Sequence, residues 1–220
     1  MTIAQMATYF DILQDKYGSP YFINSEKSLL LNRAQILFVK ELLPNDPDQL
    51  INLEATQNTI MEITPLIVPL TVLGIPSNGI ITYTAIQTAL SVLVPGSTYW
   101  RTIQFGYSID GGISFVPVKY VRHNDWYAFA ANYFKNPTDA NPKVVESYNG
   151  FQIAPINVNA GLYATVLKYP IVVDIDGAIS SDLPDFTHDK IVAIALELAG
   201  IGTRDQMLNA LIEAKGQNGG

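Results

Sequence analysis

The sequence predicts an α+β protein in which N- and C-terminal helices form a helical bundle with an inserted antiparallel β-rich region. Apolar residues near both ends recur at three- and four-residue steps, as they do along one face of an amphipathic helix. From about residue 66 the spacing between apolar residues shortens towards two, which is typical of strands. Turn dipeptides then separate β-branched and aromatic runs. We therefore assign residues 1–65 and 179–216 to the bundle and residues 66–178 to the insertion.

The helix expected at residues 2–16 is the first element of the bundle. Its apolar residues form one stripe, and Thr2 and Gln5 have the spacing of a capping box, in which two side chains satisfy free backbone N–H groups at a helix start. Gly18-Ser19-Pro20 is expected to end this helix.

Two further helices are expected before the insertion. The second spans about residues 28–43, with Ser25 and Ser28 as candidate caps, because serine oxygens accept hydrogen bonds from the first helical N–H groups. The third spans about residues 48–62, with Asp48 as its candidate cap and a proline soon after its end.

Turn signals divide the middle of the chain into short strands. Asp110-Gly111-Gly112 and Asn149-Gly150 each separate two strand-like runs, so each predicts a hairpin. Pro69 cannot donate a ladder hydrogen bond, which favours a sheet edge for its strand. The stretch 88–94 is ambiguous between strand and helix. The other expected strands lie at residues 66–73, 79–84, 99–108, 113–121, 144–148, 151–156, 162–169 and 171–173.

The end of the chain returns to helical periodicity. One helix is expected at residues 187–199, after Pro184 and Asp185. Thr203 and Gln206 repeat the capping-box spacing and predict a last helix to about Lys215.

The chain contains unusually few charged residues. Charged residues make up 15% of it, and none occurs from Ile63 to Trp100, whereas an average globular chain has roughly 25%. Such a segment is expected either in a buried sheet or on a surface that other subunits cover. Prolines interrupt it, so it does not predict a transmembrane helix. The first ten residues have neither a basic region nor a cleavage site, so no signal peptide is expected.

The net charge and the lack of cysteine argue against several classes of binding site and catalytic site. The chain carries a formal charge of −7 and no cluster of Lys and Arg, which disfavours a generic phosphate-binding surface. An acidic protein could still line a channel through which DNA slides without binding. The absence of cysteine excludes disulfides, thiolate catalysis and cysteine-ligated zinc.

One short run resembles an enzyme motif. Ile171 to Ala178 reads as an apolar strand followed by Asp-x-Asp-Gly, and it resembles the first motif of haloacid dehalogenase-type phosphatases. The resemblance implies Asp174 as the nucleophile and Asp176 as the general acid, with a magnesium ion. Ala178 stands where that family has threonine, and only about 40 residues follow, too few for its other motifs. The alternative is a turn whose carboxylates face water.

The histidines offer a second, weaker catalytic pattern. His123 lies near Asp125 and His188 near Asp189, so each could belong to a metal site or a base–carboxylate pair. The alternative is a surface or helix-cap histidine. No nucleophile elbow and no phosphate-cradling glycine loop occurs. We therefore expect no enzyme, and no catalytic, cofactor or metal-binding residues.

An aromatic run lies between residues 126 and 134. Its near-helical spacing favours core and interface packing over a platform for a sugar or a base, although a glycan-binding module remains an alternative function. Trp, Tyr and Arg are common at the centres of protein interfaces. The candidate interface residues of this region are Arg122, Trp126, Tyr133, Phe134 and Lys135.

Five segments of the sequence together carry a resemblance to a known family. Two lie near the start, at Phe10–Phe22 and Leu31–Gln35. Two follow in the middle, at Arg122–Asp125 and Asn132–Pro137, and the last is Leu183–Asp189. Together they resemble neck proteins of crAss-like tailed bacteriophages, and they occur in the order of that family, spread between residues 10 and 189.

The resemblance implies a virion structural protein that forms a head-to-tail connector ring. Such a ring is a homo-oligomer, a dodecamer where it follows the portal's symmetry, and it lies beneath the portal protein and joins other neck and tail proteins. Genomic DNA would pass through its lumen without specific binding, no membrane is involved, and assembly takes place in the host cytoplasm. A C-terminal helix that reaches the portal would offer Met207, Leu208, Leu211 and Ile212 as contacts.

Overall fold

The computed structural model describes residues 1–16, 22–43, 61–110, 114–131, 136–157 and 159–200. They divide into two compact units. The helical unit comprises the residues up to 43, 61–65 and those from 170 onwards, and the β unit comprises residues 66–169. The α+β class is thereby confirmed. Residues 170–178, which the sequence assigned to the insertion, lie in the helical unit.

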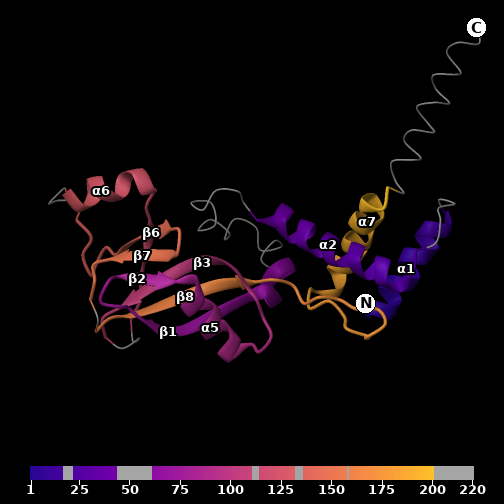
Figure 1. Ribbon diagram of the computed structural model, residues 1–220, viewed down its shortest axis with the longest axis horizontal. Helices are drawn as coiled ribbons and strands as arrows, with labels where there is room; N and C mark the ends of the chain where they lie inside the picture. Colours follow the sequence, from indigo (N-terminus) through magenta and orange to yellow (C-terminus); the bar gives the residue numbers. More distant parts are fainter. Residues whose placement is uncertain (17–21, 44–60, 111–113, 132–135, 158, 201–220) are drawn as a thin grey trace, which may run out of the picture. The chain divides into compact units, whose positions relative to one another are not determined.

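Helices α1 (Ile3–Lys16), α2 (Asn24–Leu42) and α7 (His188–Leu198) build the helical unit (Figure 1). Helix α7 packs against both others, and Lys27 of α2 forms a 2.6 Å ion pair with Asp11 of α1. The short 3-10 helix η3 (Asp185–Thr187) leads into α7, and η2 (Thr64–Leu66) leads out of the unit. Side chains that the three helices bury include Met6, Phe10, Leu31, Phe38, Val39, Ile191 and Val192.

Of the N-terminal caps predicted for the first two helices, that of α1 is confirmed and those of α2 are wrong. The α1 capping box is confirmed, because the Thr2 N–H donates to Gln5 Oε1 at 2.8 Å and the Gln5 N–H donates to Thr2 Oγ1 at 3.3 Å. The caps proposed for α2, Ser25 and Ser28, are wrong, since both lie inside the helix. Instead, the Ile23 N–H donates to Glu26 Oε2 at 3.0 Å.

The first sheet of the β unit has the order β1-β8-β3-β4 and is antiparallel throughout. The proline-containing strand β1 lies at its edge, as predicted. Ile67 pairs with Leu167, so the chain enters and leaves the β unit on neighbouring strands. The strands are β1 (Ile67–Gly74), β3 (Tyr99–Ser108), β4 (Val116–Pro117) and β8 (Gly161–Lys168).

The second sheet has the order β2-β7-β6-β5, with β5 parallel to β6. The predicted hairpin at Asn149-Gly150 is confirmed by the β6–β7 pairing. Gly150 has φ +150°, and a Cβ there would lie 2.0 Å from Ile81 O, so no other residue fits. The strands are β2 (Ile80–Thr82), β5 (Lys119–Tyr120), β6 (Lys143–Ser147) and β7 (Gly150–Ala154).

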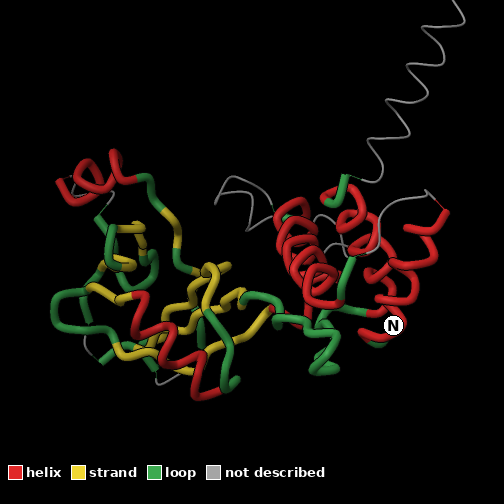
Figure 2. The backbone as a smooth tube through the Cα atoms, turned by 45° about the vertical axis from the view of Figure 1, so that its right-hand side comes forward, coloured by secondary structure: helices red, strands yellow, loops and turns green. Residues whose placement is uncertain are grey.

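The two sheets and helix α5 (Tyr83–Leu93) share one hydrophobic core. Strands occur only in the β unit among the described residues, whereas the helical unit consists of helices and loops (Figure 2). The core includes Ile81, Ile86, Leu90, Phe105, Val144, Phe151, Ile153, Leu162 and Val166.

The structure resolves one open assignment of the β region and corrects two expectations. The stretch 88–94, left open between strand and helix, is helical up to Leu93, because α5 begins after Thr82, whose Oγ1 accepts from the Ala85 N–H at 3.2 Å. The second arm of the first hairpin, 113–121, is divided: β4 pairs with β3, but β5 joins the other sheet. Residues 171–173 form no strand.

Two predicted helices lie wholly or mostly outside the residues that the structure describes. The last one, 203–215, lies outside the described residues. So does most of 48–62, of which only residues 61 and 62 are described, and both are helical.

Candidate functional site

The predicted interface region of the β unit is partly described. Helix α6 (His123–Ala131) carries Trp126, which is half-buried, and Tyr127, which is 73% exposed. Arg122 is exposed just before it. The other predicted interface residues lie outside the described residues: Tyr133, Phe134, Lys135, Met207, Leu208, Leu211 and Ile212.

A cation–π contact attaches α6 to β6. The Lys143 ammonium lies 3.7 Å from the centroid of the Phe129 ring, and Lys143 is only 4% exposed. An aromatic face attracts a cation most strongly where water is excluded. The aromatic run therefore packs through Phe129 and leaves Tyr127 on the surface.

The Asp-x-Asp-Gly run forms a tight turn. The backbones of Asp174 and Ile179 exchange hydrogen bonds of 3.0 and 2.8 Å, and Ala178 has φ +54°. Asp176 accepts a hydrogen bond from Asn24 Nδ2 at 2.7 Å. The strand that precedes the nucleophile in the phosphatase motif is not formed here, so the geometry is that of the predicted alternative, a turn. In the described part of the chain, no three His, Cys, Asp or Glu residues gather as a metal site would require.

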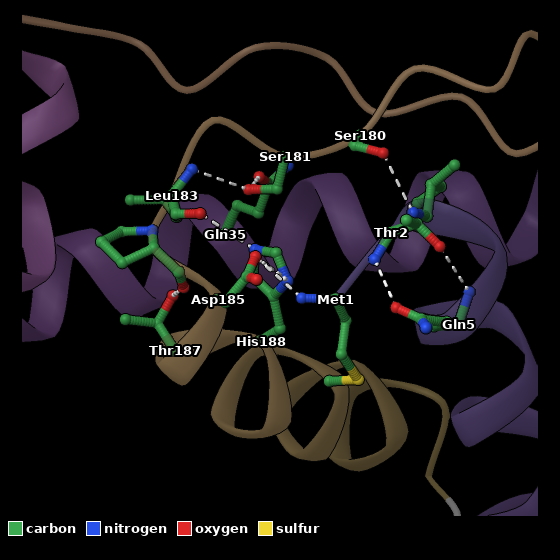
Figure 3. A network of polar contacts seen from close by, with 12 residues as sticks. Met1, Thr2, Gln5, Gln35, Ser180, Ser181, Leu183, Asp185, Thr187 and His188 are labelled. Carbon is green, nitrogen blue, oxygen red and sulfur yellow. Dashed lines mark hydrogen bonds and ion pairs between the residues drawn. The ribbon is translucent and has the colours of Figure 1, made fainter.

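His188 belongs to a polar network beside the start of α1 rather than to a pair with Asp189. It is 1% exposed, and its Nε2 lies 3.0 Å from Leu183 O; because a carbonyl only accepts, this nitrogen carries a proton. Its Nδ1 lies 3.8 Å from Asp185 Oδ1, and the Met1 ammonium lies 2.8 Å from the same oxygen. Figure 3 shows Met1 and His188 both directed towards Asp185. The other histidine, His123, is exposed and lies in the other unit.

The Met1 ammonium also favours the charged form of Asp185. Its hydrogen bond lowers the pKa of Asp185, with smaller contributions from its charge and from His188. Nearby, the Ile3 N–H donates to Ser180 Oγ at 3.0 Å. These contacts tie α1 to the segment that precedes α7, which is a structural role.

Polar side chains of α2 bind residues 171–183, a segment that we call the strap, mainly through its backbone. Asn32 accepts from the Val173 N–H at 2.8 Å and donates to Val173 O at 2.9 Å. Ser28 accepts from the Ile175 N–H at 3.1 Å. Gln35 accepts from Ser181 Oγ at 2.5 Å. The spacing of 28, 32 and 35 places these side chains on one helix face, so the strap is held through polar contacts.

Because its backbone faces α2, the strap turns several apolar side chains outwards. Val172 is 70% exposed, and Ile171 and Ile179 are also exposed. Phe186, just beyond the strap, is exposed as well. We call these four exposed apolar side chains the strap surface.

An aromatic pocket of about 290 Å³ opens in the β unit. Phe151 and Thr102 are buried in its wall, while Trp100 and Arg101 are half-buried and Glu146 is exposed. The lining residues come from α5, β3, β5, β6 and β7, and they are Tyr83, Tyr99, Trp100, Arg101, Thr102, Ile103, Tyr120, Glu146 and Phe151.

Hydrogen bonds fix the orientation of two tyrosines in this pocket. The Tyr83 hydroxyl donates to Glu146 Oε1 at 2.6 Å, and the Tyr99 hydroxyl lies 3.0 Å from Thr102 Oγ1. Burial raises the pKa of Tyr83, and its hydrogen bond to Glu146 raises it further. Burial also raises the pKa of Tyr99 and of Tyr120. All three phenols therefore stay protonated at neutral pH.

Two polar groups of the pocket have unused bonding capacity. The Tyr120 hydroxyl is buried without a hydrogen-bond partner. The Arg101 guanidinium forms no hydrogen bond or ion pair with any other described residue. Sequence reasoning placed several of these residues in strands and missed the pocket, because no local pattern joins residues from five elements.

No helix within the described ranges is both long and apolar enough to cross a membrane. A comparison of the chain with protein-family models and with curated proteins finds no match.

Proposed function

We propose that the protein is a virion structural protein, a head-to-tail connector whose ring joins the portal to the tail and lets DNA pass. The observation that carries this proposal is the strap surface, because its apolar side chains are presented outwards by specific polar contacts behind them. The resemblance of five sequence segments to phage neck proteins supports the same role and suggests a dodecamer. Localisation in the virion neck follows from this proposal.

Exposed apolar side chains occur in both units, which suits a protein with several neighbours. The β unit exposes Val92 and Leu93 on α5, within the segment that lacks charge, and Tyr127 on α6. A homo-oligomeric ring forms when one such contact repeats around an axis and closes. The strap surface is our candidate for the contact with a neighbouring subunit.

The charge distribution suits passage of DNA. Residues 66–169 hold six Lys and Arg against four Asp and Glu, a net charge of +2, so the rest of the chain carries −9 and the whole chain −7. A lumen lined by acidic residues would repel phosphates and keep DNA from adhering.

The test is electron microscopy and native mass spectrometry of the chain co-expressed with the portal protein of its own genome. We expect portal particles with an added ring and a defined subunit number. Bare portals beside free monomer would overturn direct docking to the portal.

Paired variants test the strap surface. Val172→Asp should abolish the ring but leave a folded monomer, because the side chain is 70% exposed and an exposed substitution changes stability by about 0.5 kcal/mol or less. Val92→Asp, at a position 77% exposed in the β unit, is the matched control. If the Val172→Asp variant forms a normal ring, the strap surface is not part of the contact between subunits.

A further inference from the structure

The aromatic pocket of the β unit has the size, walls and polar groups of a ligand site, and the connector role does not account for it. Its volume of about 290 Å³ is at the lower end of the range of about 300–1,000 Å³ for ligand pockets. A single pyranose ring fits within this volume.

We propose that this pocket binds one neutral pyranose ring of an oligosaccharide, and that the adjoining ring lies against the stacked pair Trp100–Tyr169. This inference goes beyond the connector function and does not depend on it. It also concerns other residues than the aromatic run of α6.

The first argument comes from the aromatic walls. Tyr83 stacks near Tyr99 with centroids 6.0 Å apart, and Phe151 meets Tyr83 edge-on at 5.4 Å. Such walls offer flat, apolar and slightly negative faces. The C–H groups on one face of a pyranose are apolar and slightly positive, so they complement these faces.

The second argument comes from Trp100 at the pocket. Its indole is parallel to the Tyr169 ring, with 4.5 Å between centroids and an interplanar angle of 1°. Tyr169 covers one face of the indole and fixes its orientation, so Trp100 is a preorganised surface, and little entropy is lost when a ligand packs on it. Trp100 lines the pocket, which makes this pair continuous with the site for the first ring.

The third argument comes from the polar groups. Arg101 has donors without a partner in the described residues, and Glu146, which accepts from Tyr83, retains further acceptor capacity,. Each sugar hydroxyl both donates and accepts, so neighbouring hydroxyls can satisfy both side chains with charge-assisted hydrogen bonds. The opposite charges of Arg101 and Glu146 cancel, which favours a neutral ligand over a phosphorylated or cationic one.

The test uses Trp100 as the reporter. The chain has two tryptophans, so the variant Trp126→Phe leaves Trp100 as the only one. This protein is titrated with methyl glycosides of glucose, galactose, mannose and N-acetylglucosamine, and with cellobiose, lactose and chitobiose. We expect a saturable change of Trp100 fluorescence with at least one sugar, and tighter binding of its disaccharide.

Substitutions in the Trp126→Phe background locate the binding. Arg101→Gln and Glu146→Gln should each weaken the binding of the best sugar about tenfold, as expected for the loss of a charge-assisted hydrogen bond. Arg122→Gln, an exposed residue of the same unit outside the pocket, is the matched control and should bind normally. Melting temperatures of the variants show that each is folded.

Three results would overturn the proposal. The first is the absence of a saturable response up to about 100 mM disaccharide, well above any useful dissociation constant. The second is unchanged binding in both Arg101→Gln and Glu146→Gln. The third is saturation by free amino acids or nucleosides but by none of the sugars.

Discussion

Asn32 shows how one side chain can hold an irregular segment. Its amide binds both the N–H and the C=O of Val173, at 2.8 and 2.9 Å, and so mimics one rung of a β-ladder. Val173 is buried, so its backbone groups have no ready substitute in water. A buried polar group without a partner costs about 1–3 kcal/mol.

Asn32→Ala is therefore expected to lower the free energy of unfolding by about 2 kcal/mol. Chemical denaturation measures this loss, and hydrogen exchange should show faster exchange of the Val173 amide. Asn24→Ala, which removes a single exposed hydrogen bond to Asp176, is the control and should cost about 0.5 kcal/mol or less. Equal losses in both variants would contradict the role of Asn32.

Phe129→Leu tests the cation–π contact with Lys143. The buried ammonium loses its aromatic partner, so we expect a loss of about 1–2 kcal/mol and faster amide exchange along α6. Tyr127→Leu, on the exposed side of α6, should change neither quantity. If the backbone amides of α6 exchange at the same rate in both variants, contacts other than the one between Phe129 and Lys143 hold the helix.

Asp185→Asn tests the tie between Met1 and the segment before α7. The pKa of Asp185 is lowered from 3.8 in the folded chain, so the carboxylate stabilises the fold above the unfolded pKa, and this contribution is lost as the pH falls through the folded pKa. We expect wild type with a free Met1 amine to melt slightly higher than Asp185→Asn at pH 6. The difference should vanish at a pH below the folded pKa; a constant difference would contradict this origin.

At the scale of elements, local signals predict local structure. The capping box of α1, the Asn149-Gly150 hairpin and helix α7 are all specified by residues close in sequence, so they were found. Residues 171–173 show the opposite case: Ile-Val-Val has the composition of a strand, yet side chains of α2 take its hydrogen bonds. The aromatic pocket could not be predicted, since its residues meet only after two sheets have packed.

The β unit is expected to fold when it is separated from the rest of the chain. All residues of its core cluster lie between Val68 and Val166, and its ends are neighbours because Ile67 pairs with Leu167. Domains with their own core and adjacent ends are commonly autonomous. A fragment of residues 66–169 should give a dispersed NMR spectrum and one cooperative melting transition. A spectrum typical of an unfolded chain would show that this core depends on other residues.

For the whole molecule, the neighbouring ends of the β unit also determine how it responds to mechanical load. A force that pulled residues 66 and 169 apart would act at one end of the β1–β8 ladder and open it pair by pair, beginning at Ile67 and Leu167. Peeling of this kind resists little force, since one rung carries the load at a time. A tension that runs through the helical unit bypasses the β unit as long as residues 65 and 170 keep their separation.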